Sequence, residues 1–475
     1  MRLKTTLSLV AIFPFTRAIQ PLDMLMDYLG HSTGAVGKLR DKNEHWENFL
    51  ENGQARSNGG ADQPLSVLIV SQYFFPENFG INAVVSDLQR RGHNVTVLTG
   101  MPNYPSGTFF DGYGGWKIRR ETWNSATVIR IPVMARGYNS WPRLVLNYLS
   151  YAVSASILGP FVLKRRPDVI LVYQPSPVTT ALPAIVMRLV TGANIVLWVQ
   201  DIWPESVTAT GAVKNRLIIG ALKQLVKLIY HSSSIIAVQS RQFVDLVGRL
   251  AAPASDIRYL PNTADYFYRP VEVPFDAPER KFFRPGFTIL FAGNLGLAQG
   301  LETVLSAIAR LKERKDIQWV FVGDGRLRGW LEHQIQEQGL SGNVQIVGSF
   351  PPERMPFFFA LADTLLMTLR DEQIFSLTVP SKLQAYLACG RPILGAISGE
   401  AANILMTSGA GLVAPPNDPE RLAEMASAMA KMPREQLDAL GKAALDYQSR
   451  EFDRDYWLDQ LEKWLQELSN RRSSS

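Results

Sequence analysis

The segment ILFAGNLGLAQG, residues 289–300, decides the fold of the second half of this 475-residue chain. Its apolar start is typical of a buried strand, and the loop that follows carries Gly293, Gly296 and Gly300. Apolar residues at helical spacing begin at Leu301. Such a turn exposes backbone N–H groups at the start of a helix, where the helix dipole favours an anion. The segment therefore predicts a strand–loop–helix unit that can bind phosphate.

A second turn of this kind follows the next predicted strand, in residues 319–326 (WVFVGDGR). A single glycine-rich turn is more often only a turn. Two in succession within one α/β unit indicate a ligand with two phosphates, such as a nucleotide diphosphate. The inference therefore depends on the order of the two turns along the chain.

Predicted strands and helices alternate along most of the chain, which indicates parallel sheets with helices on both faces. The fold class is therefore predicted as α/β, with two doubly wound, Rossmann-like domains whose parallel sheets face an interdomain cleft. We expect a partly disordered N-terminal extension (1–64), an acceptor domain (65–265), a linker (266–286), a donor domain (287–450) and a C-terminal helix with a tail (451–475). Strands are predicted at 65–70, 95–98, 128–131, 169–172, 195–199, 235–238, 258–260, 289–291, 319–322, 344–346, 364–367 and 393–395.

The composition argues against several classes of function. The net charge is only +6, and no basic helix with interleaved aromatic residues occurs, so nucleic acid is not an expected partner. The histidines have no metal-ligand spacing, and the segment 453–455 (Asp-Arg-Asp) is predicted to be a solvated helix start, so no metal is expected. The single cysteine, Cys389, excludes an internal disulfide and is predicted to be a buried packing residue.

The longest uncharged run spans residues 144–163, with Arg143 before it and Lys164, Arg165 and Arg166 after it. A run of this length can just cross a bilayer. Three alternatives remain open: a helix packed on the core of the first domain, a helix in the membrane interface with the basic cluster on anionic headgroups, and a transmembrane span. The predicted strand directly after the run favours a helix that lies on the first domain.

An ordered set of motifs supports a more specific assignment. The first domain carries SQYFFPENFGINAVVSDLQRRGHNVTVLTG (71–100), WVQDIWPES (198–206) and LPNTADYFYRP (260–270). The second carries FAGNLGLAQGLETVL (291–305), VGDGRLR (322–328), VGSFPPERMP (347–356) and VPSKLQAYLACGRPIL (379–394). Over about residues 65–465 the chain resembles glycosyltransferase family 4, the retaining transferases of GT-B fold, and within it the WcaI/WbuB type of colanic acid and O-antigen biosynthesis. The resemblance implies a nucleotide diphosphate sugar on the second domain and the acceptor on the first.

The resemblance assigns the donor site to the loops of the second domain. Relatives often place an Arg and a Lys around the first glycine loop, where this chain has Asn294 and Gln299. Lys382, at a predicted helix start, is therefore the expected catalytic cation on the β-phosphate, with Arg326 as second candidate. The predicted donor-binding residues are Gly293, Asn294, Gly296, Gln299, Gly323, Gly325, Arg326, Ser349, Phe350, Pro380, Ser381 and Gln384.

The chain departs from the family pattern at two positions. The usual pair of glutamates is replaced by Leu377 and Ala385. Because the second glutamate normally holds the nucleotide ribose, Gln384 or Ser381 is expected to supply that hydrogen bond. The loss also fits an inactive member, but the intact frame around it favours an active one.

Two carboxylates of the first domain are candidates for work on the acceptor. Asp201 follows the predicted strand 195–199, and Glu205 follows four residues later. A carboxylate at the carboxyl end of a parallel strand can orient or deprotonate an acceptor hydroxyl, and Asp201 is predicted to do so, with Glu205 as the alternative acid or base. A helix N-cap is the other interpretation of Asp201. The first strand-to-helix loop is expected to add Glu77, Asn78, Gly80 and Asn82 on the acceptor side.

The sequence thus predicts a retaining glycosyltransferase of the hexosyl or N-acetylhexosaminyl type. The donor is a nucleotide diphosphate sugar, with a UDP-sugar favoured, and the acceptor is a saccharide on polyprenyl diphosphate, in cell-surface polysaccharide biosynthesis (exopolysaccharide or O-antigen). No cofactor is expected besides this co-substrate. The expected location is the cytoplasm, peripheral on the inner face of the cytoplasmic membrane, although the start of the chain weakly resembles a secretory signal. The alternatives are a nucleotide-sugar epimerase of the same fold and a non-catalytic nucleotide-sugar-binding subunit of a polysaccharide assembly complex.

Overall fold

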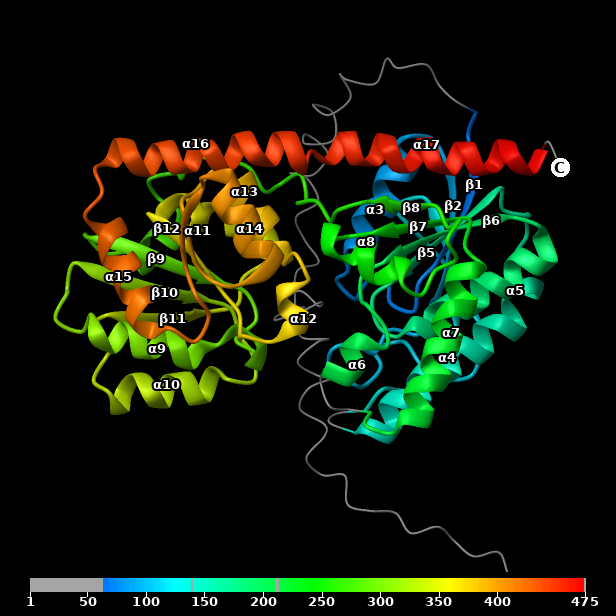
Figure 1. Cartoon of the computed structure of the whole chain (residues 1–475), viewed down its shortest axis with the longest axis horizontal. Helices are drawn as coiled ribbons and strands as arrows, with labels where there is room; N and C mark the ends of the chain where they lie inside the picture. Colours follow the sequence, from blue (N-terminus) through cyan, green and yellow to red (C-terminus); the bar gives the residue numbers. More distant parts are fainter. Residues whose placement is uncertain (1–62, 138–139, 210–212, 474–475) are drawn as a thin grey trace, which may run out of the picture.

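The computed structural model describes residues 63–137, 140–209 and 213–473. The predicted N-terminal extension, with its signal-like start, lies almost entirely outside these residues. Figure 1 shows two α/β domains side by side, each built around one sheet. The predicted fold class is confirmed.

The first domain contains an eight-stranded sheet in the order β3-β4-β2-β1-β5-β6-β7-β8. All neighbouring strands pair in parallel except β3 and β4 at one edge. The central strands are apolar and buried on both faces, as parallel strands between two helix layers must be. The strands are β1 (Ser66–Val70), β2 (Asn94–Gly100), β3 (Arg119–Trp123), β4 (Ala126–Ile131), β5 (Val169–Gln174), β6 (Asn194–Val199), β7 (Ile235–Val238) and β8 (Ile257–Tyr259).

Helices follow most of these strands. They are α3 (Gly80–Arg90), α4 (Trp141–Val162), the 3-10 turn η2 (Val178–Ala181), α5 (Leu182–Thr191), α6 (Glu205–Ala209), α7 (Arg216–His231) and α8 (Arg241–Gly248). The Asn215 side chain caps α7 by accepting a hydrogen bond from Leu217 N, and Gly192 ends α5 in a left-handed conformation. Right-handed crossovers place α4, α5 and α7 on one face of the sheet and α3 on the other.

The second domain contains a six-stranded parallel sheet in the order β11-β10-β9-β12-β13-β14. Its strands are β9 (Phe287–Ala292), β10 (Ile317–Val322), β11 (Val344–Gly348), β12 (Thr364–Thr368), β13 (Ile393–Ala396) and β14 (Gly411–Ala414). The α-helices are α9 (Leu301–Arg310), α10 (Arg328–Glu337), α11 (Met355–Leu361), α12 (Gln373–Ser376), α13 (Ser381–Ala388), α14 (Gly399–Ser408), α15 (Pro419–Ala430) and α16 (Arg434–Glu451). Short 3-10 turns are η3 (Pro278–Phe282), η4 (Leu297–Gln299) and η5 (Pro352–Arg354).

Of the fourteen strands in the two sheets, twelve were predicted from the sequence and two, β3 and β14, were not. β3 is a polar edge strand (RRETW), so it lacks the apolar pattern of the others. β14 is a four-residue strand at the other sheet's edge. Both depend on pairing with a neighbour rather than on their own composition.

The long apolar run lies in α4, which is long and apolar enough to cross a membrane by length and composition alone. Its inner face is buried and packs against α5, β2 and β4. The helix is therefore part of the layer that covers the first sheet. Its outer face bears exposed Leu146, Leu149, Val153, Ile157 and Phe161. The structure thus supports a domain helix with an apolar outer stripe.

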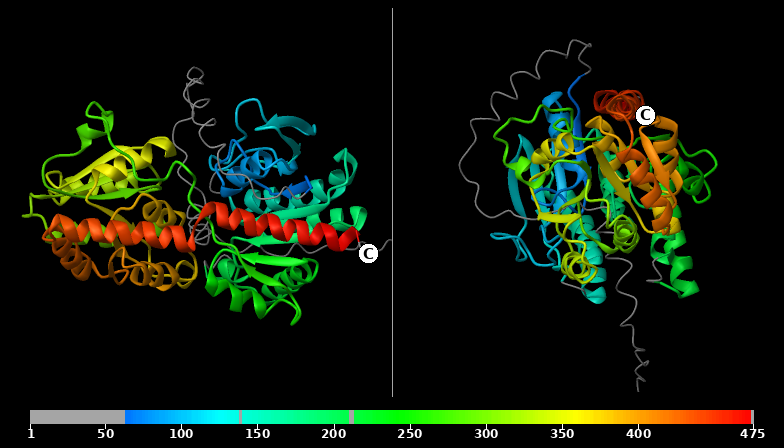
Figure 2. Two further views of the ribbon diagram at one scale, coloured as in Figure 1. Left: turned by 90° about the horizontal axis from the view of Figure 1, so that it is seen from above. Right: turned by 90° about the vertical axis from the view of Figure 1, so that its left-hand side faces the viewer.

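The C-terminal helices connect the two domains. Figures 1 and 2 show α16 on the second domain and α17 (Arg454–Ser473) continuing across the first. Phe452, between the two helices, is buried in the core of the second domain, whereas Leu461, Leu465 and Leu468 are buried in the core of the first. The helices α16 and α17, which we call the C-terminal rod, therefore pack on one domain each and connect the two domains.

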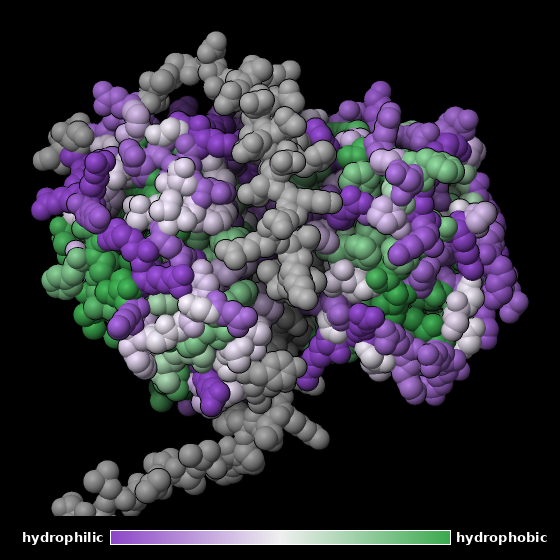
Figure 3. Space-filling view, turned by 180° about the vertical axis from the view of Figure 1, so that it is seen from behind, coloured by the Kyte–Doolittle hydropathy of each residue, from purple (hydrophilic) through white to green (hydrophobic). Residues whose placement is uncertain are grey.

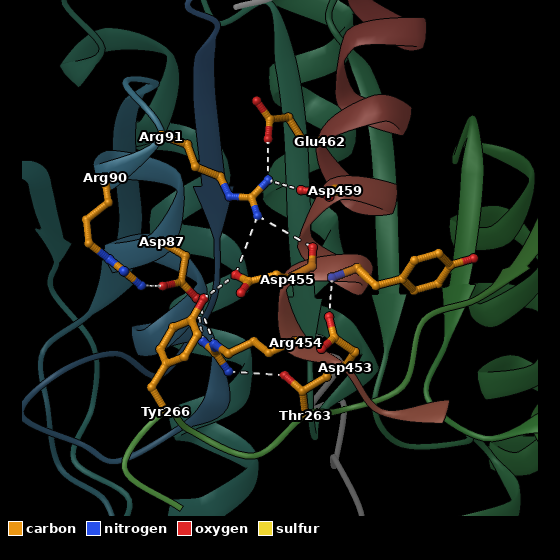
Figure 4. A network of polar contacts seen from close by, with 11 residues as sticks. Asp87, Arg90, Arg91, Thr263, Tyr266, Asp453, Arg454, Asp455, Asp459 and Glu462 are labelled. Atoms are coloured by element: carbon orange, nitrogen blue, oxygen red, sulfur yellow. Dashed lines mark hydrogen bonds and ion pairs between the residues drawn. The ribbon is translucent and has the colours of Figure 1, made fainter. Parts of the chain in front are cut away.

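A polar network anchors the start of α17 on the first domain (Figure 4). Arg454 donates to Asp87 of α3, with Nη2 2.5 Å and Nε 3.0 Å from Oδ2, and both side chains are buried. Arg91 pairs with Glu462 at 2.7 Å. Asp453 accepts from Tyr456 N, so the predicted helix start is confirmed. The prediction that this start is solvated is wrong for Arg454, because α17 folds back onto α3.

Breaking this buried pair should loosen the rod from the first domain. We expect Arg454→Met to lower the free energy of unfolding by about 1.5–3 kcal/mol, because Asp87 loses its buried partner and keeps only the half-exposed Arg90. The exposed Arg450, which pairs with Glu451, is the matched control, and Arg450→Met should cost under about 1 kcal/mol. Urea denaturation measures both, and adding Asp87→Asn to Arg454→Met should restore much of the loss. Equal effects of the two single variants would contradict the anchoring role.

Candidate functional site

Two glycine loops meet at one edge of the second sheet. Because β9 and β10 pair in parallel, the loops that follow them start side by side. Gly293 N donates to Val322 O at 2.8 Å, and Leu295 N donates to Asp324 O at 2.8 Å. A Cβ on Gly323, where φ is +147°, would lie 1.9 Å from Gly293 O. The loops therefore approach each other so closely that only glycine fits at position 323.

Lys382 extends over the first of these loops. It lies in the first turn of α13, and its Nζ donates to Gln299 Oε1 at 2.7 Å and sits 3.9 Å from the centre of the Phe291 ring. A Cβ on Gly293 would lie 2.4 Å from Lys382 Cε, so this glycine makes room for the lysine. Gln299 is itself held through its carbonyl oxygen, which accepts from Thr368 Oγ1 at 2.8 Å.

The environment of Lys382 favours an anionic ligand. Within the described ranges no carboxylate pairs with its ammonium group, and desolvation by burial lowers its pKa to about 7. A cation kept without an opposite charge is unfavourable unless a negative group binds beside it. The leaving diphosphate of a nucleotide sugar is such a group. Gln299, predicted as a donor ligand, therefore also positions the lysine.

The remaining predicted donor residues differ in their position around the two glycine loops and Lys382, which we call the cradle. Gly323 N donates to Gly348 O at 2.8 Å, so Ser349 follows a strand end beside the loops, and its buried Oγ has no hydrogen-bond partner among the described residues. Phe350 packs on Phe358, with ring centres 4.7 Å apart, and therefore serves the core. Arg326 is exposed on the second loop. The geometry thus favours Lys382 over Arg326 as the cation at the cradle.

The start of α13 carries the last group of donor predictions. Pro380 is the N-cap residue of α13 and Ser381 its first helical residue. Gln384 is buried, and neither its Oε1 nor its Nε2 has a partner within the described part of the chain. It lies two positions after Lys382, so it points to another side of the helix, whereas Ala385 shares the face of Lys382. The expected ribose hydrogen bond from Gln384 thus stays a prediction.

Leu377 lies where the two domains touch. It follows α12 directly, and it packs against the apolar core of the first domain. α12 itself contacts α6 of the first domain. One of the two replaced glutamate positions therefore makes an apolar contact between domains.

Asp201 and Glu205 have different surroundings. Asp201 is buried, and its Oδ2 accepts from Trp203 Nε1 at 2.9 Å and from Ser206 Oγ at 3.2 Å. Desolvation raises its pKa to about 7. Glu205 begins α6, the helix that meets α12, and its buried Oε2 has no hydrogen-bond partner among the described residues. Glu205 is therefore freer than Asp201 to hold an acceptor hydroxyl.

Glu77 orders the first loop of the first domain. Its Oε1 accepts from Asn103 N and Tyr104 N, both at 2.8 Å, and its Oε2 accepts from Phe74 N at 3.2 Å. Desolvation nevertheless raises its pKa to about 7. Asn82 donates to Glu77 O at 2.7 Å, so it also braces the loop. Gly80, exposed at the start of α3, and the half-buried Asn78 are the predicted residues left at the loop surface.

Comparison with known protein families gives one match in each of the two domains. Residues 286–431 match the model described as glycosyl transferases group 1, and residues 80–263 match the glycosyl transferase 4-like domain. The probable glycosyltransferase WbjE of Pseudomonas aeruginosa is 30% identical over 297 residues, which cover 61% of this chain and 72% of WbjE. The chain belongs to the group 1 glycosyltransferases.

Two further matches extend this result. The putative colanic acid biosynthesis glycosyl transferase WcaI of Escherichia coli K12 is 28% identical over 344 residues, 69% of this chain and 82% of WcaI. The structure of Anabaena HepE in complex with UDP and glucose superposes with a TM-score of 0.61 at 14% identity, over 84% of this chain and 99% of HepE. The predicted resemblance to the family is therefore confirmed, and the likeness to HepE supports the GT-B fold.

One buried polar cluster of this glycosyltransferase was not predicted from the sequence. Gln72 follows β1, Asn103 lies shortly after β2, and both form hydrogen bonds with Asn147 of α4. Gln72 Nε2 donates to Asn147 Oδ1 at 2.8 Å, and Asn147 Nδ2 donates to Asn103 Oδ1 at 3.3 Å. Asn103 Oδ1 also accepts from the backbone of Arg136, a buried cation. Amide residues shortly after two adjacent strands were the available signal.

The close approach of the glycine loops can be tested by adding one methyl group. We expect Gly323→Ala to weaken nucleoside diphosphate binding at least about tenfold, since the clash with Gly293 O must push the loops apart. Gly329→Ala, inside α10 with nothing within 4 Å, is the control and should bind normally. Fluorescence or calorimetric titration measures both, and normal binding by Gly323→Ala would contradict the role of the loops.

The lowered pKa of Lys382 predicts proton uptake. At pH 8 the side chain is roughly nine-tenths neutral, and a bound diphosphate should raise its pKa again, so binding should take up close to one proton. Affinity should accordingly fall as the pH rises above 7. Calorimetry in buffers of different ionisation enthalpy measures the uptake. Lys382→Met should abolish the proton uptake, whereas the control Lys431→Met, changed at an exposed lysine, should keep it. Proton uptake by Lys382→Met would disprove the assignment.

Proposed function

We propose that this glycosyltransferase moves a hexosyl or N-acetylhexosaminyl group from a nucleotide diphosphate sugar to a saccharide acceptor with retention of configuration. The donor is a UDP-sugar and the acceptor a saccharide on polyprenyl diphosphate, in the biosynthesis of a cell-surface polysaccharide. The observation that carries the proposal is Lys382, a cation without a described carboxylate partner above two touching glycine loops.

The proposed chemistry begins with departure of the nucleoside diphosphate. Negative charge then develops on the β-phosphate, where the loop amides and Lys382 Nζ stabilise it. The acceptor hydroxyl attacks from the face that the leaving group vacates, and its proton passes to the departing phosphate. Glu205 or Asp201 orients that hydroxyl. Closure of the two domains, which touch through α6 and α12, would exclude water from the donor and limit its hydrolysis. No metal ion is required by this scheme.

Three observations support the substrate classes. WcaI is described as a colanic acid biosynthesis enzyme, and HepE was solved with UDP. The apolar outer stripe of α4, followed by the exposed Lys164, Arg165 and Arg166, suits a protein that works beside a lipid. We therefore propose that the enzyme works in the cytoplasm, peripheral on the inner face of the cytoplasmic membrane.

A non-catalytic subunit that only binds a nucleotide sugar is the second candidate. It is favoured by Leu377 and Ala385, which leave two usual polar contacts to the donor unmade. Such a protein would bind the donor and release no nucleotide. The deciding measurement is therefore turnover.

The test is release of nucleoside diphosphate from a panel of UDP- and GDP-sugars, with and without a membrane lipid extract. We expect one UDP-sugar to be consumed, strongly faster with the extract, and Lys382→Ala to lower kcat at least about a hundredfold without unfolding the protein. Glu205→Gln should lower kcat, and Asp201→Asn should chiefly lower the thermal stability. Donor binding without release would favour the non-catalytic candidate, and release without extract, with formation of an isomerised sugar, would favour an epimerase.

A further inference from the structure

Exposed apolar side chains gather on one layer of the first domain. Of the nineteen large hydrophobic side chains exposed among the described residues, eleven lie on α4, α5 and α7. Within the described second domain, Met406 is the one such side chain. Figure 3 shows a hydrophobic region at the outer side of the first domain, bordered by hydrophilic atoms, and hydrophobic atoms on the second domain as well. The concentration is therefore a property of one helix layer and not of the whole surface.

The three helices lie on the same face of the first sheet. The crossovers β4–α4–β5, β5–α5–β6 and β6–α7–β7 all step in one direction along the sheet, so their helices share a side. α4 packs on α5. Arg188 of α5 donates to Ser232 O, at the end of α7, at 2.6 Å. The outer faces of the three helices thus belong to one surface.

Each helix contributes apolar groups to this surface. The α4 stripe, Leu146, Leu149, Val153, Ile157 and Phe161, has helical spacing, so these side chains stand on one line. Near the end of α5, Leu189 is 81% exposed and Val190 is also exposed.

α7 adds a contribution that the sequence analysis did not find. Leu217 is 84% exposed, and Ile218 and Leu228 are also exposed, whereas Val226, Ile229 and Tyr230 are buried in the core. The helix therefore has an apolar inner face and further apolar groups outside. Exposed apolar groups of this kind are unfavourable in water, and their gathering on one surface marks an interaction site.

The charge around these groups has one sign. Residues 140–166 and 213–231 together carry eight Lys and Arg and no Asp or Glu. This exceeds the net charge of +6 of the whole chain, so the remainder is net acidic. Apolar groups amid lysine and arginine alone are complementary to the headgroups and acyl chains of an anionic bilayer.

We propose that the outer faces of α4, α5 and α7 form a docking face that seats this enzyme on an anionic lipid bilayer. The inference deepens the proposed function, and rests on it for the lipid-linked acceptor. The first residues of α4 and α7 lie at the carboxyl edge of the sheet, the edge that carries Asp201 and Glu205. A membrane held against the docking face therefore borders the sheet edge that carries Asp201 and Glu205.

Co-sedimentation of the full chain with vesicles tests the docking face without donor or acceptor. Binding to vesicles of phosphatidylcholine with 30% phosphatidylglycerol, about tenfold or more above pure phosphatidylcholine and reduced by 0.5 M NaCl, is expected. Leu217→Gln/Ile218→Gln should weaken binding at least about tenfold, since two aliphatic groups no longer enter the bilayer. Phe275→Gln/Met406→Gln, changed at exposed apolar sites outside the three helices, should leave it unchanged.

A second pair of variants tests the charge. Lys214→Gln/Lys223→Gln should weaken binding about twentyfold, whereas Lys431→Gln/Lys442→Gln, exposed on the second domain, should not. Equal vesicle binding by wild type and both docking-face variants would overturn the inference, as would absent binding. So would sedimentation velocity showing a dimer that Leu217→Gln/Ile218→Gln dissociates, because a second copy would then occupy the face. Nucleotide release with the lipid extract, measured separately, fails only if the proposed function fails.

Discussion

The close contact between the loops after β9 and β10 is the constraint on which the proposed donor site of this glycosyltransferase depends. Two glycines without side chains let the backbones meet, with Gly323 against the carbonyl of Gly293. Gly293 also leaves the space that Lys382 fills from α13. Strand pairing, loop conformation and the position of the cation are therefore one arrangement, and a methyl group at either glycine would disturb all of it.

The cation itself shows how this chain departs from its family. Relatives often carry basic residues around the first glycine loop, whereas here Gln299 occupies that segment and hydrogen bonds to a lysine from another helix. Burial keeps the pKa of Lys382 near 7, so its charge responds to what binds beside it. Leu377, at a usual glutamate position, instead joins the domains through an apolar contact. In the proposed donor site, the polar groups are therefore arranged differently from the family pattern.

Holding the two domains in register is the task of the C-terminal rod. α16 packs on the second domain, α17 returns to the first, and the buried Arg454–Asp87 pair fixes the joint. On the opposite sheet face of the first domain lie α4, α5 and α7, whose outer surface is apolar and basic. Donor loops, rod and helix layer thus occupy separate parts of the molecule, so each can be altered without rebuilding the others.

The sequence alone determined the α/β class, twelve of the fourteen strands, the two glycine turns and the family, because these follow from local periodicity and from motifs in order. It also singled out Lys382. Only the tertiary structure decided that Asp201 is tied to Trp203 and Ser206, that Arg454 is buried, and that the buried Gln384 amide has no hydrogen-bond partner among the described residues. Edge strands β3 and β14 and the exposed face of α7 likewise emerged only in three dimensions. Burial, pairing and direction of a side chain depend on segments distant in sequence, and no local pattern encodes them.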